Sequence, residues 1–530
     1  MTLALPLVML AACLSRQFRR NAPLLLAFAP LPAFLAAFAL PTGSIVTFPP
    51  ALLELKLALD KPGAMLLGAA ALLWMTAGAY ATHYLRDNPN GGRFSIWWLM
   101  TLAGNFGTFL AADLVAFFLF FTLASLAAYG LVVFDATAEA KRAANLYVAL
   151  ALLGEAFLLI AFVLLAAARP DGSLVISDTV AALAASPWRD YTMAFLILAF
   201  GLKIGLFPFH VWMPMTYPAA PIPAAAALSG AAVKVGVIGL IRFLPLSSAM
   251  PDWGTILVVA GLFSAFYGVA IGITQLNAKA VLAYSSVSQM GLLAAVLGKG
   301  LWVGETSAAL VAAFSAMFHV LVKGGLFLAV GIAAPTKRGV LLVLVPATAL
   351  ALGLGGLPLT GGALAKLAAK PLMDEGIVGT LATISAVGST ILMLHFLRRV
   401  CSDAGTVATP ALLAPWLVTA LAALVVPWVL YSNVTDGSLR DALAPKEIWE
   451  SLWPVLLGAL ASLALWRWGH LLPRIPPGDV LAADKELTRL GDAFGAAMEK
   501  IDRRLREWPV ASALLLGVAI ALSVSTFLGP

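Results

Sequence analysis

Apolar residues dominate the chain in long windows, and polar residues are confined mostly to short stretches between them. A charge-free window of about 20 residues is long enough to cross a bilayer as a helix. We therefore predict an all-α polytopic membrane protein with about 14–16 transmembrane helices. Met1–Leu14 has no basic n-region or cleavage site, and we expect it to form a shorter, uncleaved first helix. The other spans are expected near 22–40, 63–82, 95–112, 114–134, 143–168, 191–209, 222–245, 254–273, 280–298, 306–333, 339–357, 377–397, 410–431, 450–469 and 509–528.

The composition excludes a soluble enzyme, a disordered chain and a disulfide-stapled scaffold. Hydrophobic residues make up 62% and charged residues 11%, against about 25% charged in soluble domains. Cys13 and Cys401 are too few for a cysteine metal cage, and nothing in the chain resembles a cofactor site. The net charge of +7 comes from lysines and arginines concentrated in the loops of one side, as membrane topology requires. The bilayer, and not a nucleic acid, is thus the expected partner.

Five basic residues lie within or at the ends of apolar segments. A charge at the bilayer centre costs about 2.5–3.5 kcal/mol unless it faces a polar or wet interior, and such residues usually mark ion or proton paths. We expect the one arginine, which is at a helix end, to reach the interface by snorkelling. We assign functional roles to the lysines. The five residues are Lys203, Lys234, Arg242, Lys323 and Lys366.

Two histidines accompany these lysines. Lys203 and His210 are seven residues apart, which is two turns on one helical face. Pro208 lies between them and further prolines follow, so we also expect the helix to break there, against protein or a water-filled cavity. His319 and Lys323 form an i, i+4 pair, in which a histidine can pass protons to a buried lysine.

A second group of helix breakers precedes Lys366 at 358–362. Interrupted segments at comparable positions of two halves indicate a transporter built from repeats. The halves would span 95–245 and 254–400, with Lys203 and Lys366 as their paired centres. One acid, Glu155, lies well inside an apolar helix, whereas Asp113 lies at a helix junction, where it could be an interface residue.

Four stretches closely resemble a known family, the proton-antiporter-type membrane subunits. Such subunits occur in respiratory complex I, in Mrp-type multisubunit cation/proton antiporters and in membrane-bound hydrogenases, and a distant branch serves inorganic-carbon uptake. The resemblance covers about 95–400. The stretches read AFGLKIGLFPFHVWMPMTYPAAPIPAAAALSGAAVKVGVIGLIRFLP (199–245), NAKAVLAYSSVSQMGLL (277–293), MFHVLVKGGLFLAVG (317–331) and GLPLTGGALAKL (356–367).

The resemblance implies two inverted five-helix repeats with discontinuous helices and a polar axis along the membrane plane. It implies that Lys203 is the central lysine of the first broken helix, followed by His210, and that Lys234 is the bridging lysine. His319 and Lys323 resemble the connecting residues of the second half, and Lys366 resembles its terminal lysine.

One position departs from the family. Thr122 occupies the place where the family usually has a glutamate that pairs with the central lysine. Glu155, on the next helix, could replace that acid. The rival interpretation is that this half has lost proton pumping and is structural or regulatory.

Six regions are expected from these patterns. In the segment 471–508, apolar residues recur every three or four positions and basic residues occupy the other face. This pattern predicts an amphipathic helix on the cytoplasmic membrane surface. The expected regions are N-terminal helices 1–94, first repeat 95–245, second repeat 254–400, additional helices 401–470, amphipathic helix 471–508 and final helix 509–530.

The expected function is proton translocation by an antiporter-like subunit of a multisubunit complex, with or without exchange for sodium. The expected location is a bacterial-type inner membrane. Alternatives are a non-conducting scaffold subunit, a component of an inorganic-carbon uptake system and a stand-alone carrier. Other membrane subunits are the expected partners, with soluble redox or carbonic-anhydrase-like subunits as further candidates. Redox activity would reside in NADH dehydrogenase-like or hydrogenase-like partners, so the sequence leaves open whether the complex is an enzyme.

Overall fold

The computed structural model describes residues 2–43, 45–48, 55–169, 172–332, 337–373, 376–402, 409–435, 437–469, 473 and 475–479. The amphipathic helix predicted in 471–508 lies almost wholly outside the described residues, and the predicted final helix 509–530 lies entirely outside them. The described helices and strands all belong to one compact unit, Met1–Pro477.

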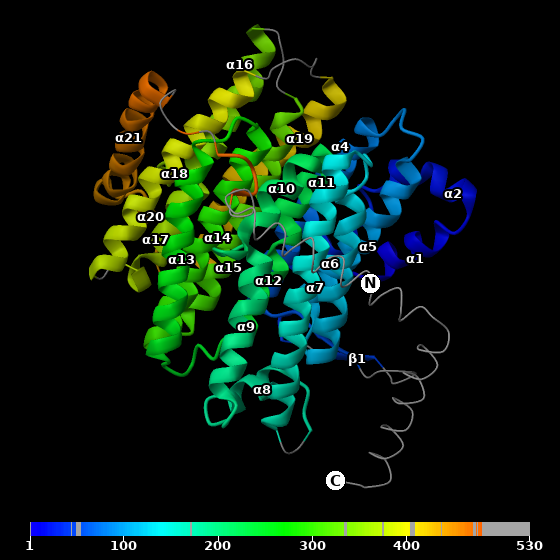
Figure 1. The fold of residues 1–530 in the computed structure, drawn as a ribbon, viewed down its shortest axis with the longest axis vertical. Helices are drawn as coiled ribbons and strands as arrows, with labels where there is room; N and C mark the ends of the chain where they lie inside the picture. The colour runs from blue at the N-terminus through cyan, green and yellow to red at the C-terminus, as the bar shows by residue number, and fades with distance from the viewer. Residues whose placement is uncertain are drawn as a thin grey trace. The chain divides into compact units, whose positions relative to one another are not determined.

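The described chain is almost entirely helical (Figure 1). Its N-terminal part contains α1 (Ala4–Ala12), α2 (Arg16–Asn21), η1 (Ala22–Leu25) and α3 (Leu31–Ala39), then an antiparallel hairpin of β1 (Ile45–Phe48) and β2 (Leu55–Ala58). The next helices are α4 (Lys61–Tyr84), α5 (Gly91–Leu110), α6 (Leu114–Val132), α7 (Ala138–Ala167), α8 (Ile176–Leu183), α9 (Arg189–Ile204), η2 (Phe209–Val211), α10 (Trp212–Ala219), α11 (Ile222–Ala227), η3 (Leu228–Ala232) and α12 (Lys234–Phe243). The remaining helices are α13 (Pro251–Gly272), α14 (Ala278–Val303), α15 (Ser307–Val330), α16 (Lys337–Leu354), α17 (Gly361–Met373), α18 (Gly376–Ser402), α19 (Pro410–Leu430), η4 (Tyr431–Asn433), α20 (Leu439–Ala442) and α21 (Pro445–Trp468).

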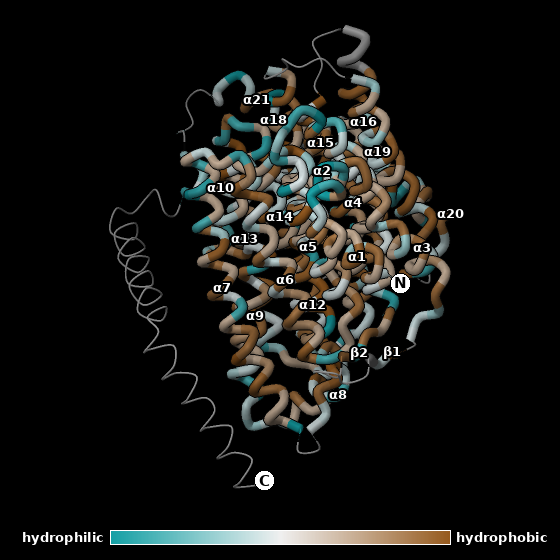
Figure 2. The backbone as a smooth tube through the Cα atoms, turned by 90° about the vertical axis from the view of Figure 1, so that its right-hand side faces the viewer, coloured by the Kyte–Doolittle hydropathy of each residue, from teal (hydrophilic) through white to brown (hydrophobic). Residues whose placement is uncertain are grey.

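The prediction of an all-α polytopic membrane protein is confirmed. Among the described residues, 11 helical segments are long and apolar enough to cross a membrane. Hydrophilic residues gather toward the ends of the helices, for example around α2 and α8 (Figure 2).

The single span predicted at 22–40 is wrong. This segment forms the short helices η1 and α3, with turns between them. Pro30 and Pro32 lack backbone donors and limit helix continuation, so the window cannot form one uninterrupted helix. At nine residues, α1 and α3 are each shorter than the roughly 20 residues needed to cross a bilayer.

At several helices, the side chain of the preceding residue satisfies the first backbone donors. The carboxylate of Asp113 accepts a hydrogen bond from the Ala116 amide (2.8 Å) at the start of α6. Thr137 and Asn277 do the same for α7 and α14. Free N–H groups at a helix start are costly when buried, so buried Asp113 has a structural role as a cap.

The centre of the unit consists of the segment Ile222–Phe243 packed against α14 and α15. An 18-residue window of this segment is entirely buried, and such windows of α14 and α15 are mostly buried. Small residues allow the neighbouring α13 and α14 to approach closely: a Cβ on Gly261 would lie 2.4 Å from the Gly291 carbonyl oxygen. Lys234, His319 and Lys323, which were singled out in the sequence, therefore lie in this enclosed centre.

Both predicted helix breaks are present. α9 ends at Ile204, where Gly205 has a left-handed φ of +72°, and the chain resumes a helical path at η2. The Trp212 indole Nε1 donates to the Leu202 carbonyl oxygen (3.0 Å) that the break exposes. α16 ends at Leu354 and α17 begins at Gly361. Freed backbone groups at membrane depth need such partners.

Candidate functional site

Lys203 lies in the last turn of α9, directly before the first break. Its Nζ donates to the Ser125 hydroxyl of α6 (2.6 Å) and to the Tyr147 hydroxyl of α7 (3.4 Å). Nζ also lies 5.2 Å from the centre of the Phe121 ring. Hydroxyl groups and an aromatic face thus stabilise the ammonium group in a buried position.

Glu155 of α7 is the acid that interacts electrostatically with this lysine. Its buried carboxyl group lies beside the hydroxyls of Thr122 and Ser125 and interacts electrostatically with Lys203. Its Oε1 atom has no hydrogen-bond partner in the described part of the chain. A cavity of about 10 Å³, bordered by Lys203, Ser125 and Tyr147, is roughly the space of one water. Ser125 thus lies beside both Glu155 and Lys203.

His210 does not share a helical face with Lys203, and that prediction is wrong. The i, i+7 argument needs a continuous helix, but α9 ends at Ile204. His210 instead follows the break and is buried among aromatic rings, stacking on Phe207 (5.8 Å between centroids) and lying edge-on to Tyr267 (5.0 Å).

Lys234 and His319 meet at the centre of the unit. The Lys234 Nζ lies 2.7 Å from the His319 Nδ1 and 3.4 Å from the Ser229 carbonyl oxygen. That carbonyl belongs to η3, a π-helical turn, a feature that frequently marks functional sites. The other imidazole nitrogen, Nε2, is buried without a hydrogen-bond partner among the described residues.

Lys323 lies one turn beyond His319 on α15. Its Nζ donates to the Leu282 carbonyl oxygen of α14 (2.8 Å). The same carbonyl accepts from the Ser286 hydroxyl (3.1 Å), which lies 3.1 Å from the Ser229 hydroxyl. The i, i+4 spacing thus places both α15 side chains near Lys234, with which each interacts electrostatically.

Two tyrosines lie between the Lys203 region and the centre. The Tyr217 hydroxyl of α10 interacts electrostatically with Tyr147 and lies close to Ser229, although it makes no hydrogen bond in the described structure. Polar side chains therefore lie between Lys203 and Lys234, but no hydrogen bond in the described structure joins the Tyr217 hydroxyl to its neighbours. The sequence reasoning missed both tyrosines because an aromatic residue on an apolar helix is more often part of the core.

Lys366 borders a much larger cavity of about 330 Å³, which has room for several waters. His319 lines one part of this cavity, and Gln289 and Ser389 add polar groups to its wall. Lys366 lies in the second turn of α17, after the second break, whereas Lys203 lies before the first. The two lysines thus occupy opposite sides of their respective breaks.

Two carboxylates beside this cavity were missed from the sequence. The Lys370 Nζ binds Glu447 Oε1 (2.8 Å) and Glu450 Oε2 (2.6 Å) of α21. The Lys366 Nζ lies 3.5 Å from the Glu450 carbonyl oxygen. The available signal was a pair of acids at i, i+3 in the first two turns of an apolar helix, a position that the helix dipole alone would favour.

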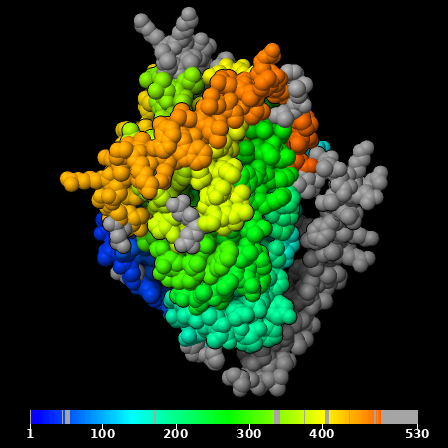
Figure 3. Space-filling model, turned by 90° about the vertical axis from the view of Figure 1, so that its left-hand side faces the viewer, coloured from blue at the N-terminus to red at the C-terminus, as the bar shows by residue number. Residues whose placement is uncertain are grey.

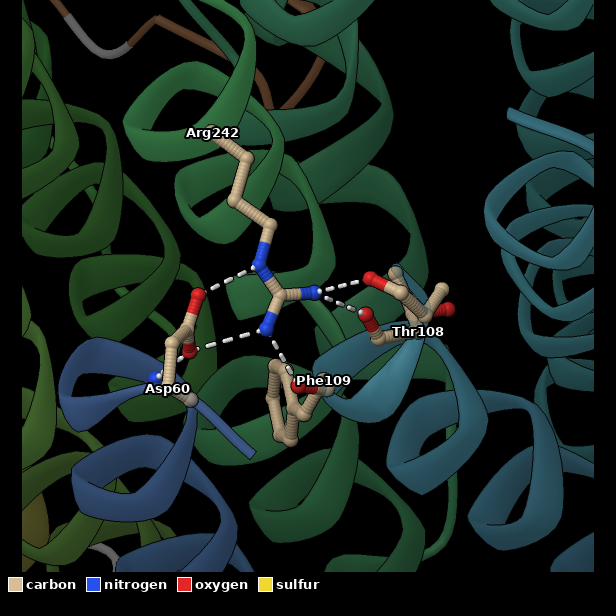
Figure 4. A network of polar contacts seen from close by, with 6 residues as sticks. Asp60, Thr108, Phe109 and Arg242 are labelled. Carbon is tan, nitrogen blue, oxygen red and sulfur yellow. Dashed lines mark hydrogen bonds and ion pairs between the residues drawn. The ribbon is translucent and has the colours of Figure 1, made fainter. Parts of the chain in front are cut away.

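Arg242 does not snorkel, and that prediction is wrong. Its guanidinium group is buried and donates to both Asp60 carboxylate oxygens (2.9 Å each). It also donates to the Thr108, Phe109 and Ala111 carbonyl oxygens at the end of α5 (Figure 4). Burial would raise the pKa of Asp60, but Arg242 and the Gly63 amide together lower it from its ordinary value. These bonds join α12 to α4 and α5, and we assign Arg242 a structural role.

The sequence and fold match known membrane proteins. Hydrogenase-4 component B of Escherichia coli (strain K12) is 30% identical over 292 residues, which are 52% of this chain and 43% of that protein. NADH-quinone oxidoreductase subunit N of Desulforudis audaxviator is 32% identical over 286 residues, 52% of this chain and 56% of that protein. The chain thus spans about half the length of these curated relatives. A chain in the structure of the Mrp complex from Dietzia sp. DQ12-45-1b shares the fold, with a TM-score of 0.78 at 23% identity, covering 100% of this chain and 63% of that one.

The family model described as NADH:quinone oxidoreductase/Mrp antiporter, transmembrane, matches residues 111–392, which are more than half of the chain. The matched region contains both helix breaks and all seven of the histidine, lysine and glutamate residues singled out in the sequence. The chain therefore belongs to the NADH:quinone oxidoreductase/Mrp antiporter family of membrane proteins.

Proposed function

We propose that this chain is a proton-translocating, antiporter-like subunit of a multisubunit membrane complex. Its path would use Glu155, Lys203, Lys234, His319, Lys323 and Lys366, with His210 beside the first break. The observation that carries the proposal is the 2.7 Å contact between Lys234 Nζ of α12 and His319 Nδ1 of α15, one from each predicted half.

This contact favours proton transfer because the pair cannot easily hold two positive charges. At 2.7 Å, two unit charges repel by about 6 kcal/mol at an effective dielectric constant of 20. The pair then shares one proton: Lys234 donates it to Nδ1, and Nε2 releases its own. His319 lines the large cavity. The imidazole so carries protons from the enclosed centre toward the Lys366 side.

Lys203 is suited to store a proton at the other end of the path. Its hydroxyl partners can also accept and donate protons, and Glu155 offsets part of the cost of the buried ammonium. A change in the distance between Glu155 and Lys203 would alter the proton affinity of the lysine and, through repulsion, that of Lys234.

The test is proton transport by the assembled complex in vesicles from the native host. Lys203→Ala and Lys366→Ala should each reduce transport by at least about 100-fold, the scale of a lost proton donor. Lys299→Ala is the matched control because Lys299 lies over the Trp302 ring, away from the path. Wild-type transport in both path variants, with normal complex assembly, would reject the proposed pathway.

One observation favours a second candidate, a non-conducting scaffold subunit. Thr122 stands where the family usually has an acid, and the direct partners of Lys203 are uncharged. If Glu155→Gln leaves transport intact while removal of residues 480–530 dissociates the complex, the scaffold interpretation holds.

The partners and location belong to the same proposal. The relatives favour other membrane subunits and a bacterial-type inner membrane. Mass spectrometry of the tagged chain, purified in mild detergent, would distinguish hydrogenase-like or NADH dehydrogenase-like companions from small antiporter subunits. A carbonic-anhydrase-like companion would instead favour the inorganic-carbon alternative. Comparing transport with and without sodium would decide whether protons exchange for this ion.

A further inference from the structure

The residues Lys370, Glu447 and Glu450, here termed the Lys370 cluster, lie where the large cavity reaches the surface. All three line the cavity together with Lys366. Their side chains are 26%, 21% and 37% exposed, whereas His319, which lines another part of the same cavity, is 2% exposed. The cavity thus extends from a buried imidazole to partly solvated carboxylates.

The cluster joins two helices that border the cavity. Lys370 is near the end of α17, Glu447 is in the first turn of α21 and Glu450 is in the second. Figure 3 shows this face, with α21 (orange) lying against α18 (yellow). Holding the first two turns of α21 against α17 keeps the Glu450 backbone beside Lys366, 3.5 Å from its Nζ.

The two glutamates differ in what they can do. Glu447 directs both carboxylate oxygens at Lys370 (2.8 and 3.0 Å). Glu450 uses Oε2 for Lys370 (2.6 Å), while its Oε1 lies 3.8 Å from the exposed Lys446. Glu450 also interacts electrostatically with Lys366. Glu450 therefore links the Lys366 ammonium with solvent.

We propose that the Lys370 cluster is the solvent-side gate of the proton path and that Glu450 accepts the proton leaving Lys366. In this step the Lys366 N–H bond breaks, an O–H bond forms on the Glu450 carboxylate, and the neutral acid releases the proton to water. Lys370 and Glu447 act as positioning residues. Lys370 competes with the proton for the Glu450 carboxylate, so protonation loosens the α17–α21 contact and bonding to Lys370 restores it.

This inference rests on the proposed function. The experiment distinguishes a failure of the gate from a failure of the proposed function. Proton transport is measured in native vesicles for Glu450→Gln, Glu447→Gln and Glu450→Asp, with complex assembly checked by native gel. Glu450→Gln should lower transport at least about 100-fold, on the scale of a lost acid–base group. Glu447→Gln also removes a contact with Lys370, but no proton acceptor of the path. It should therefore lower transport less than about threefold, far below the loss of an acid–base group.

Two further readouts separate a proton acceptor from a structural contact. Glu450→Asp should restore most of the transport and shift its pH profile, since the acid remains but its distance to Lys366 changes. Glu305→Gln, at an exposed carboxylate outside the cavity, is the control for lost charge. If Glu447→Gln and Glu450→Gln are equally impaired, or Glu450→Asp has an unshifted profile, the gate is wrong. If Lys366→Ala transports normally, the proposed function itself fails.

Discussion

The two broken helices place a lysine in different surroundings. Lys203 lies before its break, enclosed by Ser125, Tyr147 and Phe121 around a cavity of about 10 Å³. Lys366 lies after its break beside a cavity of about 330 Å³ that reaches partly exposed carboxylates. A common plan, a helix break with an adjacent lysine, thus yields one closed and one open environment. If both halves carry protons, the structure captures them at different stages of access.

The largest expected effect is a difference in stability between glycine-to-alanine variants at the two breaks. A Cβ on Gly362 would lie 1.7 Å from the Gly353 carbonyl oxygen, so Gly362→Ala should cost more than about 3 kcal/mol, beyond ordinary overpacking. Gly205→Ala meets the flexible end of Met213 and a left-handed φ of +72°, which costs about 1–2 kcal/mol.

Thermal unfolding of the two purified glycine variants in the same detergent measures this difference. The second break should prove the less tolerant one. Equal losses of stability would mean that backbone relaxation absorbs the Gly353 contact and that the breaks are mechanically alike.

The next effect tests whether the closed half conducts. Glu155→Gln removes the charge that lies near Lys203 while keeping the shape, and should reduce transport by about 100-fold. Because Thr122 lies beside Glu155, adding Thr122→Glu to that variant should restore a large part of the activity. Transport that is unaffected by Glu155→Gln would assign the first half to the scaffold interpretation.

A smaller effect measures access to water directly. In a Cys401→Ser background, Ala386→Cys places a thiol in the wall of the large cavity and Ala151→Cys places one beside the small cavity. A membrane-impermeant maleimide should modify the first at least about tenfold faster, because a buried thiol must await local opening. Similar rates would contradict the open–closed distinction. The Cys401→Ser protein alone serves as the blank, since its remaining thiol, Cys13, is buried.

The smallest effect concerns the ion pair that anchors the first half. The lowered pKa of Asp60 means that the folded state binds a proton less readily than the unfolded chain. Its stabilisation is therefore complete above the ordinary pKa of about 3.9 and is lost as pH falls through the lower folded value. Because the Asp60 side chain is 43% exposed, solvent screening limits this contribution to about 1 kcal/mol.

Melting temperatures of the wild type and Asp60→Asn at pH 7 and pH 3 provide the measurement. The gap between the two proteins should be larger at pH 7. A gap that stays constant would show that the contacts of Arg242 with the α5 carbonyls, and not the charge of Asp60, fix this anchor.

The sequence predicted features that depend on local chemistry. The proline-rich run after Lys203 and the Pro-Leu-Thr-Gly-Gly run before Lys366 predicted both breaks, and the i, i+4 spacing of His319 and Lys323 predicted that they share one face of a helix. Glu450 was missed because its partner Lys370 is 80 residues away and its own surroundings resemble an ordinary helix start. Arg242 was misassigned for the same reason, since Asp60 is 182 residues distant. Contacts between remote segments depend on packing, which local patterns do not encode.

The Arg242 contacts also bear on how the protein is made. All of its acceptors, on Asp60 and at the end of α5, precede it in the chain. During synthesis from the N-terminus, α4 and α5 are therefore available when Arg242 leaves the ribosome, which reduces the cost of inserting a charged helix. Lys370 has the opposite order, because Glu447 and Glu450 follow it. Insertion of the second half must then proceed with an unpaired lysine until α21 emerges.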